Sequence, residues 1–173
     1  MRVPRRREGE ENSLLTLRPT TEADLAFVLS AEQDPANRPY VGQWTKEQHL
    51  TAMSDSDMAH LIARQDADGR PVGYAILAGL RQGSASVELK RLVATEKGRG
   101  VGRTMLQIIK RSAFDVRHAH RLWLDVREHN LRAQHLYASE GFTAEGRLRE
   151  CVMVDGRYES LIVMSILEQE YRC

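Results

Sequence analysis

The sequence has few cysteines and few aromatic residues. Cys151 and Cys173 are the two cysteines among 173 residues, and aromatic residues make up 6% of the chain. Two thiols cannot supply the disulfide framework of a small secreted domain. A chain of this length can bury a sizeable core without such cross-links. The composition therefore predicts a protein of a reducing compartment, and we expect it in the cytoplasm.

The chain also has no excess of either positive or negative charge. The chain has 25 basic and 24 acidic residues, which give a formal net charge of +1. No global electrostatic field therefore attracts nucleic acid or an anionic membrane surface, and we expect neither as a partner. No apolar run approaches the roughly 18 residues that a transmembrane helix needs. Hydrophobic residues make up 42%, as in an ordinary globular protein.

The first twelve residues differ from the rest of the chain in composition. Their basic half is followed by Glu8, Glu10 and Glu11 instead of the apolar segment of a signal peptide. We therefore expect residues 1–12 to be a charged, mobile tail. No repeat or low-complexity linker divides residues 13–173, which we expect to form a single domain.

The hydrophobic pattern changes irregularly between the period of a strand and that of a helix. Turn signals separate the segments, the strongest being Asp155-Gly156 between two apolar runs. The expected order is a strand, two helices, three strands, a helix, a strand, a helix and two strands. Such an order predicts an α/β (α+β) fold with a mixed sheet flanked by helices, and not a doubly wound fold. The expected strands are 13–19, 59–65, 72–80, 84–94, 121–126, 151–154 and 157–166, and the expected helices are 21–29, 45–53, 101–116 and 130–139.

Three glycines stand at alternate positions in the segment 97–102, between a predicted strand and a predicted helix. Glycine allows a ligand to approach the backbone closely, and the free N–H groups at a helix N-terminus attract anions. Arg99 and Arg103 add cationic groups that suit phosphate. The loop therefore predicts a phosphate-binding site, although an isolated motif of this kind is equally compatible with a turn that only caps a helix.

Two other glycine-rich phosphate loops do not fit this spacing. Counted from Gly98, a Walker A loop requires Gly-Lys where Arg103-Thr104 stands, and the dinucleotide-binding fingerprint requires a third glycine at Arg103. An ATP- or NAD-binding protein is therefore disfavoured.

The loop matches the pattern Arg/Gln-x-x-Gly-x-Gly/Ala, with Lys97 in the first position and Gly100 and Gly102 as the glycines. In this it resembles the GCN5-related N-acetyltransferases (GNAT superfamily). A second signature of that family matches in order and spacing at Asn130, Ala133, Leu136-Tyr137 and Gly141-Phe142. The resemblance covers roughly residues 87–166.

The resemblance implies a mostly antiparallel central sheet and transfer of an acetyl group from acetyl-CoA to a primary amine by direct attack. A non-catalytic acyl-CoA-binding module of the same fold is the alternative. Homodimers are common in the family, so a homodimer is possible. The cofactor-binding residues that the resemblance implies are Leu92, Val93, Ala94, Lys97, Gly98, Arg99, Gly100, Val101, Gly102, Arg103, Thr104, Asn130, Ala133 and Tyr137.

Two catalytic residues are expected by the same resemblance. Amide formation needs a deprotonated amine and a proton donor for the leaving thiolate. Tyr137 is the candidate acid and Glu88 the candidate base. The alternatives are that Tyr137 is a core aromatic residue and that Glu88 forms a surface ion pair, for example with Lys90.

The acceptor is a small-molecule or peptide amine by this resemblance. The end of the sequence resembles the branch with spermidine/diamine and ribosomal-protein N-terminal acetyltransferases. Tyr40, Trp44 and Glu150 are candidate contacts for an amine, or alternatively plain surface residues. The six histidines show no zinc-ligand spacing, and we expect no metal.

Overall fold

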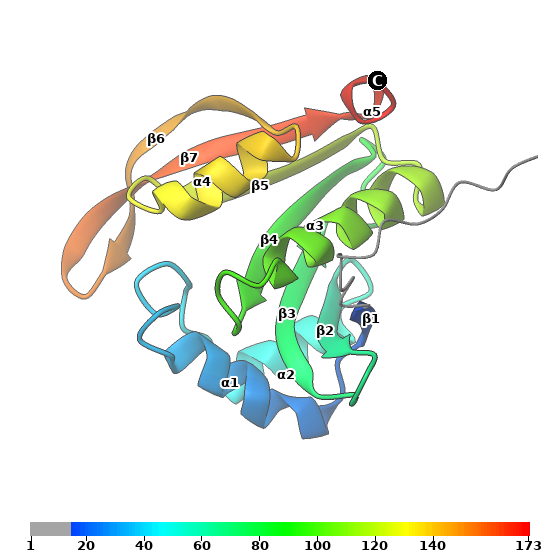
Figure 1. The fold of residues 1–173 in the computed structure, drawn as a ribbon. Coiled ribbons are helices and arrows are strands. Elements are labelled where there is room, and N and C mark those ends of the chain that lie inside the picture. The colour runs from blue at the N-terminus through cyan, green and yellow to red at the C-terminus, as the bar shows by residue number, and fades with distance from the viewer. Residues whose placement is uncertain (1–14) are drawn as a thin grey trace, which may run out of the picture.

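The structure of the chain, a computed structural model, describes residues 15–173 (Figure 1). The tail expected at residues 1–12 lies outside the described residues. The predicted order of strands and helices is confirmed, with two short helical turns and a C-terminal helix added. The elements are β1 (Leu15–Pro19), η1 (Glu22–Asp24), α1 (Leu25–Gln33), α2 (Lys46–Ser54), β2 (Ala59–Gln65), β3 (Pro71–Ala78), β4 (Ser86–Ala94), α3 (Val101–Arg111), η2 (Ser112–Val116), β5 (Arg121–Arg127), α4 (Leu131–Ser139), β6 (Thr143–Val154), β7 (Arg157–Leu167) and α5 (Glu168–Tyr171).

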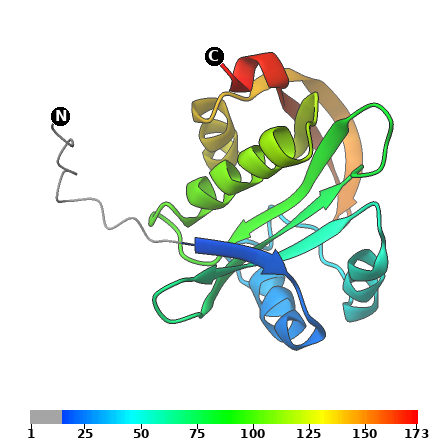
Figure 2. The ribbon, with the colours of Figure 1, turned by 90° about the vertical axis from the view of Figure 1, so that its right-hand side faces the viewer.

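The strands form one seven-stranded sheet in the order β1-β2-β3-β4-β5-β7-β6. The β4–β5 pair is parallel and the other neighbours are antiparallel, so the predicted fold class is confirmed. Helices α1 and α2 cover one face, and α3 and α4 cover the other (Figure 2). A separate apolar core fills each layer.

The central strand β3 shows why both layers form. Tyr74 and Ile76 pack into the core under α1 and α2, while the alternating Ala75 and Leu77 pack into the core under α3. All four side chains are buried. A strand that is covered on both faces carries a continuous apolar run instead of alternating apolar and polar residues.

The parallel pair β4–β5 is short. Only residues 86–88 pair with residues 121–123, whereas β5 pairs with β7 along its whole length. Beyond Glu88 the two central strands therefore separate. A wedge-shaped opening in the middle of the sheet results.

A β-bulge lies just beyond the point of separation. Leu89 pairs with Leu77 and Arg91 pairs with Ile76, so Lys90 is the extra residue. Strict alternation along the strand would place Leu89, Arg91 and Val93 on one face of the sheet, but the structure does not. Leu89 packs under α3, whereas Val93 packs with α1, because one inserted residue exchanges the faces of every residue that follows.

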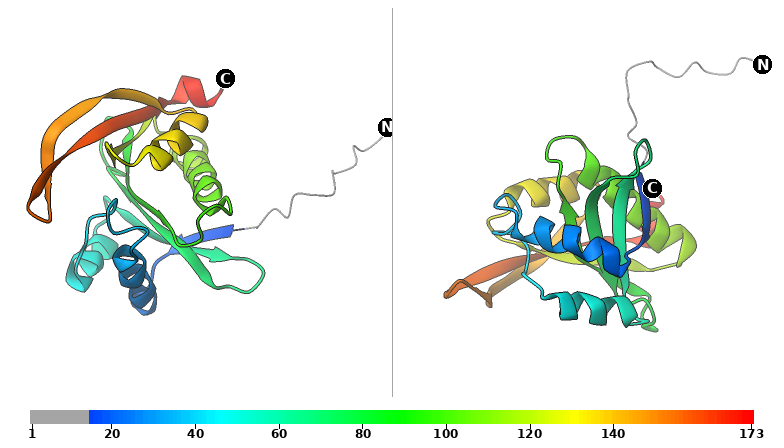
Figure 3. Two further views of the ribbon diagram at one scale, coloured as in Figure 1. Left: turned by 60° about the vertical axis from the view of Figure 1, so that its left-hand side comes forward. Right: turned by 90° about the horizontal axis from the view of Figure 1, so that it is seen from below.

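The hairpin of β6 and β7 turns at Asp155-Gly156, as predicted. Both residues have positive φ (47° and 78°), as in the tight turns that this dipeptide favours. The hairpin curves away from the rest of the sheet (Figure 3), and β6 is the edge strand with mostly exposed residues. None of the described helices is long and apolar enough to cross a membrane.

Candidate active site

A cleft of about 1280 Å³ occupies the opening between β4 and β5. Its walls come from the ends of these strands, the glycine loop, the first turn of α3, the helix α4 and the loop between α1 and α2. It brings together most of the predicted cofactor-binding residues. These are Leu92, Val93, Ala94, Lys97, Gly98, Gly100, Val101, Gly102, Arg103, Asn130, Ala133 and Tyr137. Arg99, Thr104 and Glu88 do not line it.

The glycine loop opens into the cleft at two positions where glycine is required by conformation. Gly98 and Gly100 have φ of +75° and +76°, a region that other residues rarely adopt. A Cβ at either position would meet no described atom within 4 Å. Gly100 is the N-cap of α3 and accepts the N–H of Thr104 at 2.9 Å. The free N–H groups of this helix end therefore favour an anion in the open space.

Two cations lie close together beside the loop. The Lys97 ammonium donates a hydrogen bond to the side-chain oxygen of Asn37, whose amide group is held by the carbonyl of Ala31 at 2.9 Å. Burial, and then the charge of Arg132 on α4, lower the pKa of Lys97. An anion bound between Lys97 and Arg132 would relieve their mutual repulsion. This part of the cleft therefore fits a phosphate group.

Asn130 fixes the start of α4 at the wall of the cleft. Its side-chain oxygen accepts the N–H of Ala133 at 3.2 Å, which is the N-cap arrangement that satisfies a free donor of the first turn. The predicted cofactor residue is thus also a helix cap.

Tyr137 lies on α4 with its ring at 5.8 Å from that of Phe142. Only 8% of the residue is exposed, yet it lines the cleft. Burial, and secondly the negative charge of Asp125, raise the pKa of the Tyr137 phenol, so the hydroxyl stays protonated. Within residues 15–173 this hydroxyl has no hydrogen-bond partner, and it is free to donate to a ligand.

Asp125 was not found from the sequence. It is an exposed carboxylate on β5, it lines the cleft, and its charge acts on Tyr137. Because Glu88 pairs with Trp123, Asp125 lies level with Lys90, where β4 and β5 have just separated. The signal was available in the sequence, since Asp125 is a carboxylate in the middle of the apolar strand Arg121–Arg127, in which Leu122, Leu124 and Val126 are buried.

Glu88, the predicted base, lies at the closed end of the opening. It belongs to the last paired rung of β4 and β5, and its carboxylate is 3.4 Å from the ammonium of Lys90. The side chain is 19% exposed. This placement corresponds to the ion pair that was the alternative interpretation of Glu88.

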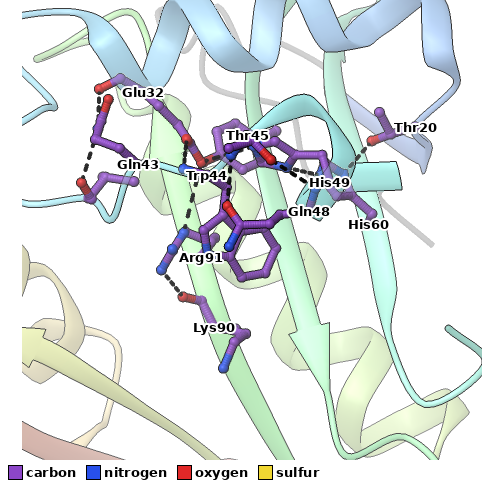
Figure 4. Close-up of polar contacts among 12 residues, drawn as sticks. Thr20, Glu32, Gln43, Trp44, Thr45, Gln48, His49, His60, Lys90 and Arg91 are labelled. Carbon is purple, nitrogen blue, oxygen red and sulfur yellow. Dashed lines mark hydrogen bonds and ion pairs between the residues drawn. The ribbon is translucent and has the colours of Figure 1, made fainter. Parts of the chain in front are cut away.

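A buried carboxylate, Glu32 of α1, lies behind the part of the cleft wall that Trp44 and Arg91 form (Figure 4). It accepts hydrogen bonds from the Tyr74 hydroxyl at 2.5 Å and the backbone N–H of Trp44 at 2.9 Å, and the Nε2 of His49 is 3.3 Å away. Burial alone would raise the pKa of Glu32, but the neighbouring His49 ring and the hydrogen bond from Tyr74 hold it below its ordinary value. Glu32 is therefore an anion inside the protein.

The hydrogen bonds continue from Glu32 through the interior. His49 and His60 are joined at 3.0 Å, and His60 is joined to Thr20 at 2.9 Å (Figure 4). Burial, and then the charge of His49, lower the pKa of His60 to about 4, so this ring is neutral near pH 7. The chain of contacts fixes α1, α2 and β2 relative to one another beneath the cleft.

The candidate amine contacts are only partly brought together. Tyr40 and Trp44 line the cleft, from the loop between α1 and α2. Glu150 does not, because it borders a separate hollow with Glu128 and Arg147. Within residues 15–173, no group of three His, Cys, Asp or Glu side chains is placed to hold a metal ion.

A cleft between separated parallel strands beside a glycine-capped helix N-terminus fits proteins that bind a phosphate-bearing cofactor. The acetyltransferase (GNAT) family model matches residues 24–142, and the chain belongs to this family.

Similar proteins support a closer comparison. The chain is 28% identical over 170 residues to a spermidine N(1)-acetyltransferase of Vibrio cholerae, a match that covers 92% of this chain and 96% of the relative. It is 38% identical over 96 residues to an uncharacterized N-acetyltransferase of Mycobacterium bovis, covering 54% and 58% of the two chains.

Solved structures share the fold. A spermidine N-acetyltransferase from Vibrio cholerae in complex with CoA and spermine has a TM-score of 0.83 at 24% identity, covering 94% of this chain and all of that one. A mutant of the SpeG spermidine N-acetyltransferase from Vibrio cholerae has a TM-score of 0.81 at 26% identity, covering 94% and 98% of the two chains.

The chain is thus an acetyl-CoA-dependent N-acetyltransferase that transfers the acetyl group to a primary amine. The alternative of a non-catalytic acyl-CoA-binding module is set aside.

Proposed function

We propose that the cleft between β4 and β5 is the active site and that its acceptor is a small-molecule primary amine. The observation that carries the proposal is the separation of the two strands, which exposes the glycine loop, Tyr137 and Asp125 to one cavity. Acetyl-CoA supplies the acetyl group as an activated thioester. The residues of the chain bind and orient it, hold the amine, and move two protons.

The cofactor-binding half extends from β4 to α3. The N–H groups at Gly98, Gly100 and Val101 hold the pyrophosphate together with Lys97 and Arg103. Beyond Glu88 no described strand pairs with this edge of β4, so the backbone of residues 92–94 offers hydrogen bonds to the thioester arm. Gly102, Asn130 and Ala133 line the same cleft and would contact this arm. Arg99 and Thr104 lie outside the cleft, and we assign them no contact.

Asp125 holds the amine. An alkylamine with a pKa of about 10.4 is mostly an ammonium ion at neutral pH, and a carboxylate in the cleft attracts it. Asp125 receives the first proton of the ammonium ion, which frees the nitrogen lone pair to form the C–N bond, and its exposed position lets that proton pass on to water. When the C–S bond breaks and Tyr137 protonates the sulfur, the second proton of the nitrogen restores the Tyr137 hydroxyl. In this scheme Asp125 takes the role for which the sequence suggested Glu88.

Tyr137 protonates the leaving sulfur. A thiol has an ordinary pKa of about 8.5, so a thiolate next to a phenol accepts a hydrogen bond readily. Because the pKa of Tyr137 is raised, the phenol is fully protonated before each turnover. Asp125 and Tyr137 thus act on opposite sides of the same carbonyl, the first as proton acceptor and the second as donor.

Replacement of Tyr137 with Phe tests this assignment. We expect kcat to fall at least about tenfold while the affinity for acetyl-CoA stays close to that of the wild type, because only the proton donor is removed. Steady-state kinetics and equilibrium binding measure the two effects. The matched control is Tyr171→Phe, which removes a hydroxyl bonded to Asp115 at the C-terminal end. Equal turnover in both variants would refute the role of Tyr137.

The acceptor and the assembly remain proposals. Relatives named for spermidine make polyamines the first acceptors to test. The exposed edge strand β6 is a surface on which two sheets can pair, and this supports the proposal of a homodimer. The cytoplasmic location also stays a prediction.

A further inference from the structure

We propose that the acceptor carries a carboxylate in addition to its primary amine, and that Arg91 recognises that carboxylate. The inference rests on the proposed function, because it concerns the acceptor half of the same cleft. It follows from where the bulge places Arg91, from what fixes its guanidinium group, and from the charges that face the acceptor.

The bulge at Lys90 puts the side chain of Arg91 on the face of the sheet that α1 and α2 cover. The loop between these helices, with Tyr40 and Trp44, lies on the same face. Its guanidinium carbon lies 4.9 Å from the centre of the Trp44 ring. Its Nε is 4.0 Å from the carboxylate of Glu32 (Figure 4). The Nε contact with Glu32 is an ion pair without a hydrogen bond, and one terminal nitrogen donates to the Lys90 carbonyl at 3.4 Å. The stacking on Trp44 and this ion pair orient the guanidinium group, and 17% of the side chain remains exposed in the cleft.

Gly42 supports this placement independently. A Cβ at position 42 would lie 2.6 Å from a terminal nitrogen of Arg91. The φ angle of Gly42 is not in the left-handed region, so its conformation does not require glycine. The missing side chain therefore makes room for the guanidinium group. Glu32, Trp44 and Gly42 together form a pocket that holds the Arg91 guanidinium group at the wall of the cleft.

The anions paired with Arg91, Arg127 and Lys90 do not line the cleft. Glu32 is 1% exposed and its oxygens are engaged by Tyr74, Trp44 and His49. The carboxylate of Glu159, 3.4 Å from Arg127, borders the separate hollow instead of the cleft. The carboxylate of Glu88, 3.4 Å from the Lys90 ammonium, does not line the cleft either. The acceptor thus meets these cations, while their counter-charges lie outside the lining of the cleft.

The charged residues that line the cleft are distributed unevenly. Arg91 stands about 10 Å before the end of β4, three residues at about 3.3 Å each, and so it is remote from the phosphate loop. Lys97, Arg103 and Arg132 lie at that loop or on α4, where the proposed phosphates bind. The cationic lining residues are Lys90, Arg91, Lys97, Arg103, Arg127 and Arg132, and the acidic ones are Glu96 and Asp125.

This distribution fits a zwitterion better than a polycation. Asp125, level with Lys90 across the opening, holds the ammonium group, and Arg91 holds the carboxylate. A guanidinium group pairs with both oxygens of a carboxylate in one plane. A polyamine would bring its second and third ammonium groups against Lys90, Arg91 and Arg127, and like charges at short range repel.

Two pairs of amines differ only in the carboxylate: lysine and cadaverine, and ornithine and putrescine. We expect kcat/KM to be at least about tenfold higher for the amino acid of each pair, the effect of one charge-assisted contact of about 1.4 kcal/mol or more. If kcat/KM for the diamine equals or exceeds that for the amino acid in both pairs, the inference is overturned, although acetyl transfer itself stands. If the wild-type protein did not bind acetyl-CoA, that result would instead contradict the proposed function.

The variant Arg91→Gln should bring the ratio of kcat/KM within each pair close to one, with unchanged affinity for acetyl-CoA. Arg81→Gln, in the loop after β3, is the control and should keep the wild-type ratio. Gly42→Ala displaces the guanidinium group without removing it, and it should lower the ratio too, so the test does not depend on one variant's folding. A preference that survives both Arg91→Gln and Gly42→Ala would overturn the role of Arg91.

Discussion

Gly100→Leu is expected to lower the affinity for acetyl-CoA at least about a hundredfold. The backbone at Gly100 is left-handed, and a side chain there costs about 1–2 kcal/mol in conformational energy alone. The added side chain would also project into the open part of the cleft, where we place the pyrophosphate. Isothermal titration with CoA and with acetyl-CoA measures the loss.

The matched control is Gly69→Leu. Gly69 has nearly the same φ (+70°) and also has no described atom within 4 Å of a Cβ, but it lies in the β2–β3 connection. It reproduces the backbone strain without blocking the cleft, so cofactor affinity should be retained. Wild-type binding by Gly100→Leu would show that the glycine loop does not hold the pyrophosphate.

Asp125→Asn is expected to reduce kcat/KM for the amine at least about a hundredfold. The amide keeps the shape of the side chain but neither attracts an ammonium ion nor accepts its proton. Binding of acetyl-CoA should change little, because the cofactor's phosphates lie at the other end of the cleft. Kinetics over a series of amine concentrations separate the effects on KM and kcat.

Glu88→Gln distinguishes the two candidate carboxylates. Glu88 is joined to Lys90 at the closed end of the opening and does not line the cleft. We therefore expect this variant to keep activity near that of the wild type. A large loss of activity in Glu88→Gln together with normal activity in Asp125→Asn would show that Glu88 is the base, as the sequence suggested.

The sequence predicted those parts of the site that are continuous along the chain. The glycine loop and the segment 130–137 are short patterns with fixed spacing, and the structure places both at one cleft. The Asp155-Gly156 turn was equally readable, because its conformation depends on the dipeptide itself. The order of strands and helices followed from periodicity, which is also local.

Features that depend on pairing between distant segments were not readable. The bulge at Lys90 exists only in the register of β4 against β3, and without it Arg91 and Leu89 are assigned to the same face of the sheet. Asp125 stands out in the sequence as a carboxylate in an apolar strand, but it becomes a site residue only because β4 and β5 separate at its level. The buried Glu32 acquires its role from Tyr74, which lies 42 positions away in the chain.

The most direct test of the account is free-thiol release from acetyl-CoA by the purified protein, with the acetylated product identified by mass spectrometry. The amines should include the two matched pairs and spermidine. The account predicts one thiol released for each N-acetylated amine, with the rate lost in Gly100→Leu and in Asp125→Asn. Amine-dependent thiol release that persists unchanged in both variants would contradict it, because the chemistry would then occur outside the cleft between β4 and β5.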